Sequence, residues 1–181
     1  MSNTTSFKRL TLEDLPVMMA IEREAFTMAW SSSVMRDSLM AAHCRAWGLY
    51  AQNRLVGFGI LSLVLDEAEI LSMSIDPIYH RRGYGEALLQ FLISQALKGK
   101  ADAMHLEVQH TNLAALNLYH KNGFKPVGTR KAYYPTPNPS VREDAILLSL
   151  SLSAQASKNI KKTSETGRSL KPTLTYSETR A

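Results

Sequence analysis

The chain has 181 residues, of which 45% are hydrophobic and 20% charged, as is typical of a soluble globular protein. This length favours one domain with a real core, and no apolar run approaches the roughly 18 residues of a membrane span. The first ten residues contain no apolar stretch typical of a secretory signal. A single cysteine, Cys44, cannot form an internal disulfide, which favours a reducing, cytoplasmic location.

Positive charge is concentrated near the C-terminus. Of the net charge of +5, the residues after Leu152 contribute +4, from six Lys or Arg against two Glu, which leaves +1 for the rest. A nearly neutral main part argues against a broad nucleic-acid-binding face. We expect residues 1–152 to form the domain. Residues 153–181, rich in Ser, Thr and Lys, are expected to form a basic, disordered tail.

The first half of the chain alternates between strand and helix patterns. Thr11 followed by Asp14 predicts a capped helix start, and apolar residues at helical spacing continue it to about Phe26. A second helix is expected from the serines at 31–33 to about Ala42. Gln52-Asn53 predicts a tight turn. Strands are expected at residues 8–10, 47–51, 55–65 and 69–75.

The second half continues the alternation. A helix is expected from the glycine-containing turn to Lys98, with Gly99 as its C-cap, and a shorter helix is capped by Thr111 or Asn112 and stopped by Gly123. Strands are expected at residues 103–109, 124–131 and 141–152, with a proline-rich loop at 133–139. The order β-α-α-β-β-β-α-β-α-β-β combines hairpins with a strand–helix–strand crossover. It predicts an α/β fold with a mixed sheet and helices on its faces.

The turn after the fourth strand has the composition of an anion site. It reads His80-Arg81-Arg82-Gly83-Tyr84-Gly85-Glu86 and opens a helix. Glycine lets the backbone approach a ligand closely, and the free amides of a helix start favour phosphate. The two arginines add positive charge there. A dinucleotide-binding turn fits less well, because Leu88 stands where a third small residue is needed.

Four segments, in order, carry a resemblance to a known family. They are Ile75 to Glu86, Leu106-Glu107-Val108, Asn112, and Leu118-Tyr119-His120-Lys121-Asn122-Gly123-Phe124. From about Lys8 to Leu150 the chain resembles the GNAT acetyltransferases, which implies the GNAT acyl-CoA N-acyltransferase fold. Further segments resemble the bacterial RimI-type ribosomal-protein-alanine N-acetyltransferases, namely Leu65-Asp66-Glu67-Ala68, Tyr133-Tyr134-Pro135 and Arg142-Glu143-Asp144-Ala145-Ile146.

The resemblance implies acetyl-CoA as the acetyl donor. It places the pyrophosphate on the backbone of Arg81, Arg82, Gly83, Tyr84, Gly85 and Glu86. It places the pantetheine along the strand edge at Met73, Ser74 and Ile75, and gives Asn112 a cofactor contact. The family pattern begins with Gln or Arg three residues before the first glycine, where this chain has His80. No metal is expected, since His105, His110 and His120 match no familiar zinc spacing.

Glu107 and Tyr119 are the candidate catalytic residues. An amine must be neutral to attack a thioester, so a proton acceptor is needed, and the resemblance implies that Glu107 has this role. It implies that Tyr119 is the proton donor toward the departing CoA sulfur. A phenol is a weaker acid than a thiol, so we expect hydrogen-bond stabilisation of the thiolate to contribute much of the effect. The structural alternatives are a solvated strand residue for Glu107 and core packing for Tyr119.

The resemblance implies that the acceptor is the N-terminal alanine of ribosomal protein bS18. Glu67, Tyr133 and Tyr134 are candidates for binding it, although a turn and ordinary loop packing account for them equally well. We expect no membrane or nucleic-acid partner, and a monomer or weak oligomer. The alternatives are the same fold acting on lysine side chains or a small amine, and a non-catalytic module binding acyl-CoA or RNA.

Overall fold

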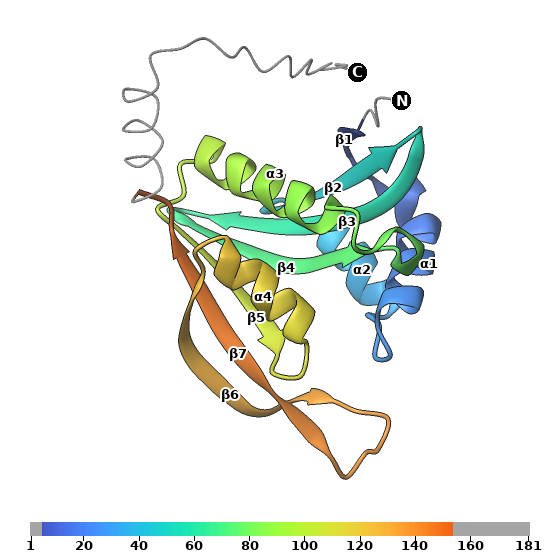
Figure 1. Cartoon of the computed structure of the whole chain (residues 1–181). Coiled ribbons are helices and arrows are strands. Elements are labelled where there is room, and N and C mark those ends of the chain that lie inside the picture. Colours follow the sequence, from blue (N-terminus) through green and yellow to red (C-terminus); the bar gives the residue numbers. More distant parts are fainter. Residues whose placement is uncertain (1–4, 154–181) are drawn as a thin grey trace.

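The computed structural model describes residues 5–153, so the predicted tail, apart from Ser153, lies outside the described residues. Within this range the elements follow the order expected from the sequence (Figure 1). No helix in residues 5–153 has the length and apolar content needed to cross a membrane. The elements are β1 (Thr5–Arg9), η1 (Leu12–Asp14), α1 (Leu15–Ala25), α2 (Ser32–Met40), β2 (Cys44–Ala51), β3 (Arg54–Val64), β4 (Glu67–Ile75), η2 (Pro77–Tyr79), α3 (Tyr84–Lys98), β5 (Ala103–Gln109), α4 (Leu113–Lys121), β6 (Lys125–Pro135) and β7 (Arg142–Ser151).

The described strands form one mixed sheet in the order β1-β2-β3-β4-β5-β7-β6. Only β4 and β5 pair in parallel, and α3 makes the crossover between them. The other neighbours pair antiparallel, as the short connections between them require. The mixed sheet predicted from the sequence is confirmed.

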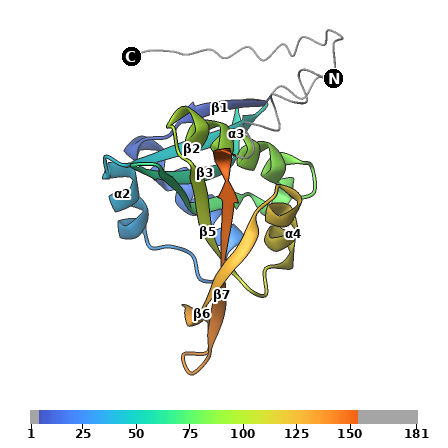
Figure 2. The ribbon, with the colours of Figure 1, turned by 90° about the vertical axis from the view of Figure 1, so that its left-hand side faces the viewer.

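Helices cover both faces of the sheet, so the protein has a core on each side. Viewed along the sheet, α2 lies on one side and α3 with α4 on the other (Figure 2). Side chains of β3 pack into both cores, and Val56 departs from strict alternation because it is the extra residue of a bulge opposite β2. Phe58 and Ile60 pack with α1 and α2, whereas Val56 and Leu61 pack with α3. All four are fully buried.

Several element boundaries differ from the sequence expectation, and two of these differences have a clear physical reason. The predicted capping box at Thr11 and Asp14 is confirmed, but it starts a 3-10 turn, and the α-helix begins only at Leu15. The expected proline-rich loop is shorter, because β6 runs on to Pro135 and Tyr134 pairs with Glu143. A proline is compatible with this position, since β6 is an edge strand and does not need every amide for pairing.

The two parallel strands separate after a short paired stretch. The pairing of β4 with β5 runs from Glu67 with Ala103 to Ile70 with Leu106. Beyond it β4 continues to Ile75 and β5 to Gln109, and Figure 1 shows the two strands diverging. A bulge begins the divergence, because Ile70 pairs with Leu61 and Ser72 with Ile60, which leaves Leu71 as an extra residue. The facing backbone edges are therefore open.

Candidate active site

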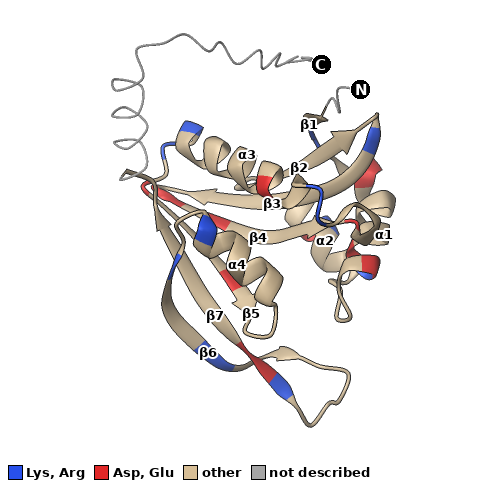
Figure 3. Ribbon diagram, in the orientation of Figure 1, with Lys and Arg blue, Asp and Glu red and all other residues tan. Residues whose placement is uncertain are grey.

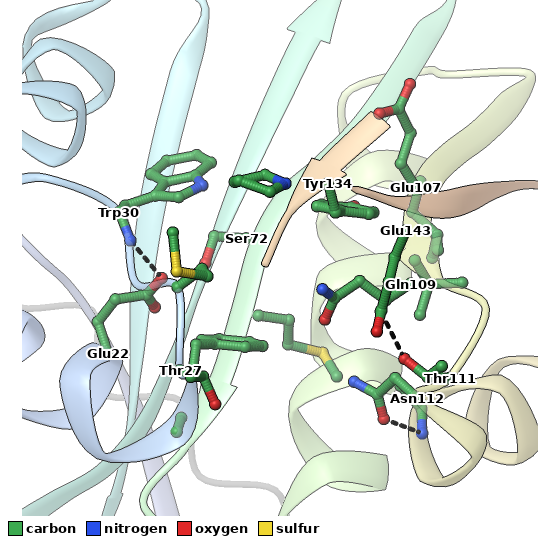
Figure 4. Close-up of a pocket in the computed structure, with 18 of the residues that line it drawn as sticks. Glu22, Thr27, Trp30, Ser72, Glu107, Gln109, Thr111, Asn112, Tyr134 and Glu143 are labelled. Atoms are coloured by element: carbon green, nitrogen blue, oxygen red, sulfur yellow. Dashed lines mark hydrogen bonds between the residues drawn. The ribbon is translucent and has the colours of Figure 1, made fainter. Parts of the chain in front are cut away.

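A cavity of about 630 Å³ lies where β4 and β5 separate. Figure 4 shows Glu22, Thr27 and Trp30 on one side of it and side chains of β5, β6 and β7 on the other. The walls combine the diverging strands, the segment between α1 and α2, the start of α4, and the end of β6. The residues that matter below are Glu22, Trp30, Met73, Glu107, Asn112, Tyr119, Tyr134 and Glu143.

Glu107 lies on β5 at the edge of this cavity. Strand alternation places it opposite the buried face of Leu106 and Val108, as the sequence predicts. Its side chain is 18% exposed, and its Oε1 lies 3.0 Å from the Arg130 guanidinium of β6. It also lines a smaller hollow of about 260 Å³, shared with Glu69 and Arg130. Glu107 is thus a partly buried carboxylate that pairs with Arg130 and belongs to the lining of both hollows, and its catalytic role stays a prediction.

Tyr119 reaches the same cavity from α4. It is buried, and its ring packs edge-on against Phe124 with the ring centroids 5.6 Å apart. Burial raises the pKa of Tyr119 well above its ordinary value, and the neighbouring Tyr134 adds to the effect. Its hydroxyl therefore stays protonated across the neutral range. Tyr119 thus packs in the core and also lines the cavity, and its role as proton donor stays a prediction.

The turn that leads into α3 has an open backbone. Gly83 is the N-cap of α3 with φ of 82°, and a Cβ there would meet no heavy atom within 4 Å. The first amides of α3 have no partner inside the helix and carry partial positive charge. Arg81 and Arg82 lie directly before them, and Figure 3 shows this charge at the start of α3. His80 Nε2 donates to the Ile75 carbonyl at 2.8 Å and ties the turn to β4.

Of the other predicted cofactor residues, some line the cavity and some do not. Met73 lines the cavity, whereas the buried Ser74 turns its hydroxyl to Glu22. Ile75 is not part of the cavity wall, and its carbonyl accepts from His80. Asn112 lines the cavity and caps α4, with its side-chain oxygen accepting from the Ala115 amide at 3.1 Å.

The three predicted acceptor residues do not share one hollow. Tyr134 lines the cavity, and burial together with the charge of Glu107 raises its pKa to about 12. Tyr133 is 39% exposed and packs on Tyr134, with ring centroids 5.1 Å apart. Glu67 lines only the smaller hollow. Residues 5–153 contain no group of three His, Cys, Asp or Glu side chains placed to hold a metal ion.

Glu22 is a cavity residue that the sequence did not indicate. Its side chain is almost fully buried, and burial raises its pKa. The Ser74 hydroxyl of β4 donates to one carboxylate oxygen at 2.8 Å, and the Trp30 amide donates to the other at 3.2 Å. Glu22 therefore ties the segment after α1 to β4. An acidic residue among the apolar positions of α1 was the one available signal.

Comparison with known proteins agrees with this geometry. The profile described as Acetyltransferase (GNAT) family matches residues 15–124, more than half of the chain. This chain belongs to the GNAT acetyltransferase family.

Two curated relatives match most of the chain. The [ribosomal protein bS18]-alanine N-acetyltransferase of Escherichia coli is 36% identical over 151 residues, which cover 83% of this chain and 99% of the relative. The protein of the same name from Haemophilus influenzae is 34% identical over 135 residues, covering 75% of this chain and 90% of the relative.

The fold is similar to that of solved acetyltransferase structures. A crystal structure of the ribosomal-protein-alanine N-acetyltransferase from Escherichia coli superimposes with a TM-score of 0.77 at 34% identity, covering 82% of this chain and 94% of that one. Arabidopsis thaliana NAA60 in complex with acetyl-CoA gives a TM-score of 0.74 at 19% identity, over 83% of this chain and 99% of that one. The second likeness, at this identity, concerns the fold alone.

Proposed function

We propose that this GNAT protein transfers the acetyl group of acetyl-CoA to the N-terminal α-amine of a protein, with the N-terminal alanine of ribosomal protein bS18 as its acceptor. The observation that carries the proposal is one cavity at the parting of β4 and β5 that a carboxylate, Glu107, and a buried phenol, Tyr119, both line. This chain matches nearly the full length of the Escherichia coli relative, and the name of that relative supports bS18 as the acceptor.

The donor side fits a CoA thioester. The open edge of β4 from Leu71 to Ser74 offers backbone groups to an extended, amide-containing chain, as a neighbouring strand would. The unhindered backbone of Gly83 and the first amides of α3 suit a pyrophosphate, and Arg81 and Arg82 add charge to the site. Acetyl-CoA, when bound, supplies the acetyl group as an activated thioester.

The acceptor chemistry needs a place for one proton. The attacking nitrogen forms a bond to the acetyl carbon, the carbon–sulfur bond breaks, and the ammonium formed must lose a proton, which Glu107 accepts directly or through a water. Tyr119 hydrogen-bonds to the leaving sulfur. Because burial raises the pKa of Tyr119, the hydroxyl stabilises the thiolate as a donor and is not itself deprotonated.

An α-amine suits this site better than a lysine side chain. The reference pKa is about 7.7–8.0 for an α-amine and about 10.4 for lysine, so far more of the α-amine is neutral at pH 7.5. A single paired carboxylate can therefore activate an N-terminal α-amine more easily than a lysine side chain, because less of the amine has to be deprotonated. With a ribosomal protein as its acceptor, the reaction belongs to the cytoplasm.

The proposal is tested with two peptides of the bS18 N-terminal sequence, one with a free α-amine and one Nα-blocked, both containing lysine. Free CoA is measured as it forms, and mass spectrometry locates the acetyl group. We expect turnover on the free peptide alone, with the acetyl group on the α-nitrogen.

Acetyl on lysine of the blocked peptide, at a rate equal to that on the free one, would replace this proposal with the lysine alternative. Binding of acetyl-CoA without turnover of either peptide would contradict the bS18 acceptor.

A further inference from the structure

The strand β6 contains a bulge of two extra residues just before Tyr134. Arg130 pairs with Ala145 and Tyr134 pairs with Glu143, so residues 131–133 of β6 stand opposite Asp144 alone. Ala132, in the middle of the bulge, has φ of 49°. This left-handed conformation is unfavourable for a residue with a Cβ. The surrounding structure must therefore hold the bulge in place.

The bulge decides which part of β6 reaches the cavity. In an uninterrupted ladder continuing from Arg130 and Ala145, Ala132 would stand opposite Glu143 and Tyr134 opposite Val141. Tyr134 would then lie two positions farther along the hairpin, about 7 Å away at roughly 3.4 Å per residue. The two extra residues bring Tyr134 back beside Glu143, and both side chains line the cavity.

Two side chains of β7 hold the bulge. Asp144 Oδ1 accepts from the Ala132 amide at 2.9 Å, and Oδ2 accepts from Lys131 Nζ at 2.6 Å. Arg142 Nε donates to the Ala132 carbonyl at 2.7 Å, and a second guanidinium nitrogen donates to the Tyr133 carbonyl. Three backbone groups that the interrupted ladder leaves without strand partners are thus satisfied by side chains.

Neighbouring side chains of β7 point to opposite sides of the strand. Arg142 and Asp144 point to the same side of β7, and Glu143 between them points to the other. Glu143 lines the cavity, where the Thr111 hydroxyl donates to it at 2.7 Å. The hydrogen bond from Lys131, followed by that from the Ala132 amide, lowers the pKa of Asp144, so this carboxylate is charged at neutral pH.

We propose that Arg142 and Asp144 are positioning residues for the acceptor: they lock the β6 bulge and thereby hold Tyr134 on the wall of the acceptor cavity. The proposal rests on the proposed function, because it assigns the cavity side at Tyr134 to the acceptor. Neither residue lines the cavity. Their loss therefore weakens the use of the acceptor and leaves the use of acetyl-CoA intact.

The kinetic test compares Arg142→Ala and Asp144→Ala with the wild-type protein, using the free bS18 peptide. We expect KM for the peptide to rise about tenfold in both variants, with KM for acetyl-CoA unchanged. Asp144→Asn keeps an oxygen for the Ala132 amide and should recover most of the loss. Lys131→Ala removes only the exposed ion pair and is the matched control, with kinetics near wild type.

A double-mutant cycle separates positioning from a general loss of structure. If Arg142 acts through Tyr134, adding Arg142→Ala to Tyr134→Ala has little further effect on kcat/KM for the peptide. Equal rises in both KM values, or effects that multiply in the double variant, would overturn the proposal. So would wild-type peptide KM in both single variants.

Hydrogen exchange tests whether Asp144 holds the β6 bulge, and it needs no acceptor. Exchange of the amides of residues 131–134 should accelerate at least tenfold in Asp144→Ala and stay unchanged in Lys131→Ala. Unchanged exchange in Asp144→Ala would show that Asp144 does not hold the β6 bulge. Failure of the wild-type protein to acetylate any peptide would instead contradict the proposed function, and the exchange result would still decide whether Asp144 holds the bulge.

Discussion

The two candidate catalytic side chains differ in how they depend on pH. Replacing Glu107 with Gln removes the proton acceptor, and we expect kcat at pH 7 to fall by about 100-fold or more. The deficit should shrink above about pH 8, because the α-amine of the acceptor then becomes neutral without help. Steady-state rates between pH 6 and 9.5 measure this change.

Tyr119→Phe should behave differently. The loss, about tenfold or more, should persist up to pH 9.5, because burial raises the pKa of Tyr119 and the wild-type hydroxyl stays protonated over the whole range. Tyr50→Phe, on β2 away from the cavity, is the matched control. Both active-site variants should bind acetyl-CoA as the wild-type protein does. Wild-type rates in either one at every pH would remove that residue from the mechanism.

At the level of single residues, sequence patterns predicted some positions better than others. The alternation of β5 was enough to place Glu107 opposite Leu106 and Val108. The bond between Glu22 and Ser74 joins residues far apart in the chain, and no local pattern encodes such a contact. The partner of Glu107, Arg130, depends on how β6 and β7 lie across β5, which is also a matter of tertiary structure.

The attachment of α1 to β4 depends on the buried Glu22. Replacing it with Ala leaves the Trp30 amide and the Ser74 hydroxyl without their acceptor, and we expect the free energy of unfolding to fall by about 1–3 kcal/mol. Glu22→Gln keeps one acceptor and should lose less. Urea denaturation measures both, with Glu24→Gln, exposed on the same helix, as the control.

The pH dependence of this effect has a definite sign. Burial raises the pKa of Glu22, so the folded state holds the proton more tightly than the unfolded state. Its contribution to stability therefore declines as pH rises from the ordinary glutamate pKa through the raised one. Glu22→Gln should lack this decline. An identical pH profile in the variant and the wild-type protein would contradict the assignment.

The start of α3 depends on the backbone freedom of Gly83. Its φ of 82° strains any residue with a Cβ, so Gly83→Ala should lower the free energy of unfolding by about 1–2 kcal/mol. Gly85→Ala is the matched control, since its Cβ would make ordinary contacts with Leu118 and Ile75. Equal stability of the two variants, measured by urea denaturation, would show that a Cβ at position 83 causes no strain.

At the scale of the whole molecule, element order was predictable and strand separation was not. Short hairpin turns and a strand–helix–strand crossover were enough to predict a mixed sheet. The point where β4 leaves β5 depends on the extra residue at Leu71, and a single inserted residue in an apolar strand leaves no mark in the pattern. The bulge of β6 was missed for a similar reason, because Tyr133 and Tyr134 beside a proline resemble a loop.

The central claim is that this GNAT protein acetylates a protein α-amine. The most direct measurement uses intact, unacetylated bS18 with acetyl-CoA, with the modified position found by mass spectrometry and Glu107→Gln run in parallel. We expect one acetyl group on the N-terminal alanine, formed far more slowly by the variant at neutral pH. Acetyl groups confined to lysine side chains, or none in the presence of bound acetyl-CoA, would contradict it.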